Sequence, residues 1–125
     1  MKKLLAVFLV AAMALALCAC GSGSEMAMGT GSATGTYYGF GGVLGQYISK
    51  YAGISVKVVS TDGSKANIQG IDSGDYQLGT VQSDVMSYAW EGTRSFEGSK
   101  VDSFRVVAGL YAEAVQLVTM DENIK

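Results

Sequence analysis

Residues 29–42 read GTGSATGTYYGFGG, a stretch rich in glycine and hydroxyl side chains that follows the short apolar run 26–28. The segment after it has helical periodicity. A strand, a glycine-rich turn and a helix in that order direct free backbone N–H groups at an anion, and glycines let a ligand come close to the backbone. Two interpretations stay open here: an anion-binding turn, or a plain strand-to-helix turn that needs glycine for its geometry.

A dinucleotide-binding turn is a weaker alternative. The glycines at 29, 31 and 35 are spaced one residue away from the usual fingerprint, and a bare glycine pattern is weak evidence. The fingerprint also expects an acidic residue about 20 positions further on, at the end of a second strand. Asp62 comes too late for that role.

The first 19 residues have the pattern of an export signal. A basic start, Met1–Lys3, precedes an apolar run at 4–17, which has the length of a secretory core and is too short for a comfortable membrane span. Leu17 at −3 and Ala19 at −1 before Cys20 match a bacterial lipobox. We therefore expect a lipoprotein signal peptide at 1–19, lipidation of Cys20, a flexible tether at 20–25 and an extracytoplasmic domain from residue 26.

Composition excludes several classes of function. Both cysteines lie in the leader, so the exported domain has no disulfide framework. The two lysines of the leader leave with it, and the seven remaining basic residues face eleven acidic ones, a net charge of −4. That balance argues against nucleic acid as a partner. The chain has no histidine, which rules out a histidine base or metal ligand.

The periodicities predict an α/β fold with a mostly parallel sheet. In residues 36–51 the predicted helix buries a face of Phe40, Val43, Leu44, Tyr47, Ile48 and Tyr51 and stops at Gly53. A polar loop at 93–103 has Phe96 as its expected anchor. The other expected elements are strands at 54–60, 77–81, 104–110 and 115–119, a helix capped by Ser64 and ending at 73–74, and a helix capped by Ser83 and ending at Gly92.

Three predicted turns share one chemical feature. The turns at 31–36, 63–64 and 82–83 each carry a hydroxyl where a strand leads into a helix. In open α/β sheets these carboxyl ends of strands line the ligand crevice. Three helix N-termini that converge there would bind a small anion, most simply a carboxylate. The alternative is that the two later serines only cap their helices.

The order of short motifs resembles the TAXI family, the extracytoplasmic solute receptors of tripartite ATP-independent (TRAP) transporters. The resemblance covers nearly all of residues 26–119. It rests on these segments: 29–38, 60–67, 74–84, 96–98 and 110–113. It implies a two-lobed periplasmic-binding-protein fold that closes on a small carboxylate or a glutamate-like amino acid and delivers it to a membrane permease. It implies no catalytic step and no cofactor or metal.

The resemblance also assigns the ligand-binding residues, by position in this sequence. They are Gly31, Ser32, Tyr37, Gly63, Ser64, Asn67, Gln82 and Ser83. Receptors of this family run to roughly twice this length, as two comparable lobes require. We therefore expect residues 26–125 to form an incomplete first lobe, with the second lobe missing. A ligand-sensing surface lipoprotein without a permease partner is a further alternative.

Overall fold

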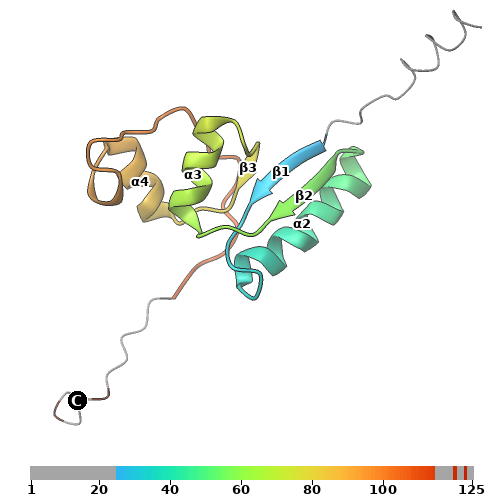
Figure 1. The fold of residues 1–125 in the computed structure, drawn as a ribbon. Helices are drawn as coiled ribbons and strands as arrows, with labels where there is room; N and C mark the ends of the chain where they lie inside the picture. The colour runs from blue at the N-terminus through green and yellow to red at the C-terminus, as the bar shows by residue number, and fades with distance from the viewer. Residues whose placement is uncertain (1–24, 115–119, 121–122, 124–125) are drawn as a thin grey trace, which may run out of the picture.

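The structure, a computed structural model, describes residues 25–114, 120 and 123. The predicted leader, Cys20 and most of the tether lie outside these residues, as does the strand expected at 115–119. Three strands and three α-helices alternate along the described chain and are followed by a short 3-10 helix (Figure 1). Their bounds are β1 (Glu25–Gly29), α2 (Thr36–Ala52), β2 (Ser55–Val59), α3 (Ser64–Ser73), β3 (Leu78–Gly79), α4 (Ser83–Glu91) and η1 (Arg94–Phe96).

The three strands form one parallel sheet in the order β2-β1-β3. Met28 pairs with Val58 on one side and with Leu78 on the other, so β1 is the central strand. The predicted α/β class with a parallel sheet and flanking helices is confirmed. Because all three strands run the same way, all three strand-to-helix turns lie at one edge of the sheet.

Helix α2 packs on the sheet most closely through glycines, and the face predicted from periodicity is only partly inward: Phe40, Leu44 and Ile48 are half-buried, whereas Val43, Tyr47 and Tyr51 are exposed. Gly41 and Gly45 are buried, and a Cβ on Gly41 would lie 2.7 Å from the Thr30 Cγ2. Tyr47 and Tyr51 of the predicted face are 58% and 73% exposed. The glycines let the helix backbone approach the strands more closely than any side chain would allow, and this turns the tyrosines outward.

Helix α3 covers the opposite face of the sheet (Figure 1). Successive residues of a strand point to opposite faces, so Met28 meets α2 whereas Gly29 faces α3. Gly29 pairs with Gly79, and the Asn67 side chain of α3 lies against both. Two paired glycines therefore bring α3 close enough for a short amide side chain to reach the strand ends.

A small apolar core joins α3, α4 and η1. Its fully buried members include Ile68, Ala89 and Phe96, and Val85 and Tyr88 pack against them. Phe96 is completely buried, which confirms that it anchors the polar loop. The same core explains why Val85, Tyr88 and Ala89 share the inner face of α4.

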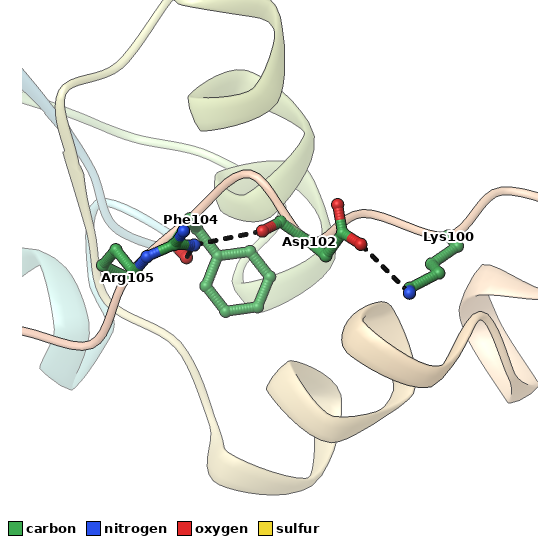
Figure 2. A network of polar contacts seen from close by, with 4 residues as sticks. All are labelled: Lys100, Asp102, Phe104 and Arg105. Carbon is green, nitrogen blue, oxygen red and sulfur yellow. Dashed lines mark hydrogen bonds and ion pairs between the residues drawn. The ribbon is translucent and has the colours of Figure 1, made fainter.

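The strand expected at 104–110 is absent, although these residues are described. Val101 donates its N–H to the Ala89 carbonyl, and Phe104 packs edge-on against Trp90 at 5.9 Å. Beyond that point the Arg105 guanidinium donates to the carbonyls of Asp102 and Phe104 (Figure 2). These carbonyls are bound by a neighbouring side chain and do not join a ladder with β3. Periodicity indicated the strand, but residues 104–110 pair with none of the three strands of the sheet.

The helices end at the predicted glycines, but they do not begin with the predicted serines as N-caps. Gly53, Gly74 and Gly92 adopt left-handed conformations at the ends of α2, α3 and α4, as predicted. The residues at the N-cap positions are Gly35, Gly63 and Gln82. The predicted caps Ser64 and Ser83 are instead the first helical residues, so both capping assignments are wrong. No helix in the described part is long and apolar enough to cross a membrane.

Candidate functional site

Backbone and hydroxyl contacts join the first two turns at the strand ends. The Gly31 carbonyl accepts hydrogen bonds from the Thr61 N–H at 3.1 Å and from the Ser60 hydroxyl at 2.9 Å. Gly63 begins the second turn at φ +89°, a conformation that L side chains rarely adopt. Its N–H donates a hydrogen bond to the Thr61 hydroxyl oxygen at 3.1 Å. The loop after β1 therefore lies against the loop after β2 in a single arrangement.

Asn67 joins all three turns from beneath. Its side chain is fully buried, and its amide nitrogen donates to the carbonyls of Thr30 at 2.6 Å and Thr80 at 2.8 Å. Its amide oxygen lies 2.7 Å from the Thr61 hydroxyl. Each of these partners follows a different strand. The residue thus supports the site from below, without lining the cavity described next.

The first residues of α2 and α3 and the N-cap residue of α4 lie around the same place. Within the described residues, no N-cap of α2, α3 or α4 makes a side-chain hydrogen bond to its helix. The first turns of α2 and α3 also contain no acidic residue. The Ser64 hydroxyl accepts the Gln82 N–H at 3.0 Å and so binds the start of α3 to the start of α4. The remaining first-turn N–H groups keep their hydrogen-bonding capacity and the positive end of each helix dipole.

These turns line an open depression of about 390 Å³, here called the strand-end cavity. Six of the eight residues predicted for ligand binding line it, whereas Ser83, exposed at the start of α4, does not. Asn67 is the other exception, for the reason given above. The lining consists of Gly31, Ser32, Gly35, Thr36, Tyr37, Asp62, Gly63, Ser64, Gln82 and Glu113.

Four lining residues were not among those predicted: Gly35, Thr36, Asp62 and Glu113. Of these, Glu113 is the most distant in sequence from the predicted turns. It comes from the segment after η1 and accepts a hydrogen bond from the Gln82 side-chain amide at 2.7 Å, across 31 positions of sequence. Tyr111, two residues earlier, packs edge-on against Phe40 and Tyr37 with ring centroids 5.3 and 6.4 Å apart. The only signal in the sequence was its place in the short segment 110–113. No periodicity indicates that this segment crosses to the turns.

Glu113 also changes the chemistry of Tyr37. Burial raises the pKa of the Tyr37 hydroxyl to about 12, helped by its hydrogen bond to the Glu113 carboxylate and opposed by the one from Ser64. The phenol is neutral at physiological pH, as an ordinary tyrosine is, and the raised pKa keeps it a hydrogen-bond donor at more alkaline pH. The pKa of Tyr111 is also raised, by burial and by the charge of Glu113.

We expect the phenolate absorbance of the chain to contain a component that titrates near pH 12 and disappears in Tyr37→Phe. The folded-state pKa is above the unfolded value of 10, so the contribution of Tyr37 to stability is complete below pH 10. It is lost as the pH rises through 12. Glu113→Gln should move the component to lower pH, whereas Tyr51→Phe, at an exposed position, should leave it in place. A component near pH 12 that persists in Tyr37→Phe would contradict this assignment.

The lining of the strand-end cavity combines hydrogen-bond donors with two carboxylates. It presents backbone N–H groups, three hydroxyl side chains of serine and threonine, a neutral phenol and an amide, together with two carboxylates. Among residues 25–114, 120 and 123, no three His, Cys, Asp or Glu side chains come together to hold a metal ion. The arrangement fits a small ligand with an anionic group at the helix N-termini.

A model of the NMT1-like family matches residues 28–125. The match covers the three turns, the strand-end cavity and the segment that carries Glu113. The chain belongs to this family, which is a periplasmic-binding-protein-like family of substrate-binding proteins. Such proteins typically act outside the cytoplasm and bind a small ligand for a transporter.

Proposed function

We propose that this member of the NMT1-like family is an extracytoplasmic receptor for a small carboxylate or a glutamate-like amino acid. The observation that supports the proposal most directly is one cavity lined by the uncapped starts of α2 and α3 and by Gln82, the N-cap residue of α4. A carboxylate placed there would accept hydrogen bonds from first-turn N–H groups and meet the positive ends of the α2 and α3 dipoles. Tyr37, Ser64 and Gln82 add side-chain donors from three different elements.

The finer parts of the proposal rest on the sequence. The short motifs shared with the TAXI family support a receptor that delivers its ligand to the permease of a TRAP transporter. The leader supports a signal peptide at 1–19 and a lipid anchor at Cys20, followed by a tether that holds the domain from residue 26 at the outer face of the membrane. In this arrangement residues 26–125 contribute the first lobe of the receptor.

A thermal-shift screen tests the binding function on the two-lobed receptor to which residues 26–125 contribute the first lobe. The panel contains L-glutamate, L-glutamine, 2-oxoglutarate and short carboxylates, with nucleotides as the competing class. A ligand at 100 times its Kd stabilises the folded state by about 2.7 kcal/mol, which raises Tm by several degrees. We expect such a shift with at least one amino acid or carboxylate.

Two variants locate the binding site. We expect Gln82→Ala and Ser64→Ala to weaken the shift because each removes a donor or a support of the cavity. Gln46→Ala, an exposed glutamine of α2, is the matched control and should bind as the unaltered chain does. A shift that nucleotides alone produce would replace this proposal by the dinucleotide alternative.

A further inference from the structure

The outer face of α2 is apolar and almost free of charge. Lys50 carries the one charged side chain among the 17 residues of this helix, all of which the structure describes. Val43, Tyr47 and Tyr51 follow one another at steps of four residues and are 55%, 58% and 73% exposed. A helix at a protein surface ordinarily presents several charged residues to water. These four residues, here called the tyrosine face, therefore have the composition of a contact surface.

Contacts within the tyrosine face hold its rings together. The Tyr47 and Tyr51 rings are stacked, with centroids 5.8 Å apart and an interplanar angle of 24°. The Lys50 ammonium lies 5.2 Å from the centroid of the Tyr51 ring. A tyrosine joins an apolar ring to a polar hydroxyl, and a lysine joins an apolar stem to a charged head. Such side chains suit the headgroup region of a bilayer, where their apolar atoms leave water while their polar ends stay hydrated.

The two tyrosines lie in the last two turns of α2, at the edge of the sheet where the strands begin (Figure 1). Helix α2 ends at Ala52, β2 begins at Ser55, and Ser55 pairs with Glu25, the first residue of β1. The Ser49 hydroxyl donates to the Ile54 carbonyl at 2.9 Å and so closes the turn between α2 and β2. The end of α2 is therefore held beside the start of β1.

The predicted lipid anchor is attached to this same edge of the sheet. Cys20 and Glu25 are five residues apart in the sequence, and a fully extended chain of that length spans at most about 18 Å. An anchor at Cys20 therefore keeps the end of α2 close to the bilayer surface. A tether this short gives the tyrosine face an effective concentration of about a millimolar or more at the membrane, so a contact too weak to form in solution becomes populated.

Resting on the lipid anchor of the proposed function, we propose that the tyrosine face lies in the headgroup region of the bilayer that carries the anchor. The rings of Tyr47 and Tyr51 enter that region, and the Lys50 ammonium meets anionic phosphate groups. The strand-end cavity lies at the other edge of the sheet, because the strands run from one edge to the other. In this orientation the cavity faces away from the membrane and stays open to solute.

Brominated lipids test the contact on the lipid-anchored receptor, purified from the membranes of a bacterial host. The receptor with Tyr51→Trp as a reporter is reconstituted in vesicles of phosphatidylethanolamine and phosphatidylglycerol whose acyl chains carry bromine next to the headgroups. We expect these vesicles to quench the fluorescence that the reporter adds, relative to the same vesicles without bromine. Ser83→Trp, at an exposed position at the cavity edge of the sheet, is the matched control and should lose no fluorescence.

Three substitutions in the reporter identify the side chains that make the contact. Tyr47→Ser should lower the ratio of bilayer-bound to free tyrosine faces about tenfold, because one ring no longer leaves water. Gln46→Ser, at the neighbouring exposed position, should leave this ratio unchanged. Lys50→Gln should lower it about fivefold, and in vesicles with phosphatidylcholine in place of phosphatidylglycerol it should have no effect.

Mass spectrometry of Cys20 separates this inference from the proposed function. If Cys20 carries no lipid, the lipid-anchor part of the proposed function fails and the inference fails with it. If the lipid is present and a carboxylate of the thermal-shift panel binds, but the reporter is not quenched, the inference alone is wrong. Aqueous iodide should quench the reporter in receptor freed from membranes. Failure to do so would show that a second copy or the rest of the receptor covers the tyrosine face, which would also overturn the inference.

Discussion

Asn67→Ala is expected to lower the free energy of unfolding by about 3 kcal/mol. The substitution removes the two donors that bind the Thr30 and Thr80 carbonyls, and it leaves these buried acceptors with fewer partners. It also opens a gap between α3 and the paired glycines of β1 and β3. For a domain of this size the change corresponds to a fall in Tm of roughly 10–20 °C. Urea denaturation followed by circular dichroism measures it.

Gln69→Ala is the matched control, since this amide lies on the same helix but is exposed. It should change stability by less than about 0.5 kcal/mol. Asn67→Asp keeps the shape and the acceptor but cannot donate to either carbonyl, so it should be at least as destabilising as alanine. A stable Asn67→Asp variant would show that the two donated hydrogen bonds do not hold the turns together.

Gly41→Leu is expected to destabilise the fold by about 3 kcal/mol. Even a Cβ at this position would lie 2.7 Å from the Thr30 Cγ2, and that side chain is completely buried. Thr30 cannot rotate away freely, because its hydroxyl donates to the Val59 carbonyl at 2.6 Å. The helix must therefore move off the sheet, which also disturbs the first turn of the site.

Gly42→Leu provides the comparison one residue along the same helix. A Cβ on Gly42 meets no other atom within 4 Å, and its backbone is helical. Replacing a helical glycine there should leave stability unchanged or raise it by about 0.5–1 kcal/mol. Equal losses in the two variants, measured by thermal unfolding, would mean that close packing of Gly41 on β1 is not what limits this position.

The contrast between helix ends and helix starts shows how far sequence reasoning reaches. Gly53, Gly74 and Gly92 end their helices as predicted, since the left-handed conformation is a property of a single residue. Ser64 was predicted to cap α3, but its hydroxyl binds the Gln82 N–H instead. A serine can do either, and the choice depends on a residue that is 18 positions away.

The candidate site likewise has a part that the sequence predicted and a part that it did not. The position of the three turns followed from the strand-helix order, because parallel strands bring their carboxyl ends to one edge. Six of the predicted ligand residues accordingly line one cavity, and their role in binding stays a prediction. Glu113 could not be derived in this way. Its segment has no regular structure, and aromatic contacts with α2 carry it to Gln82.

By itself the sequence determined the alternation of strands and helices, the parallel sheet, the places where helices end and the edge at which the turns gather. These features depend on local backbone preferences and on the period of apolar residues, which neighbouring positions decide. Only the tertiary structure decided which face of α2 meets the sheet, where the Ser64 hydroxyl binds, that residues 104–110 form no strand and that Glu113 reaches the cavity. Each of these depends on contacts between segments far apart in the chain, where close approach and hydrogen-bond partners outweigh local pattern.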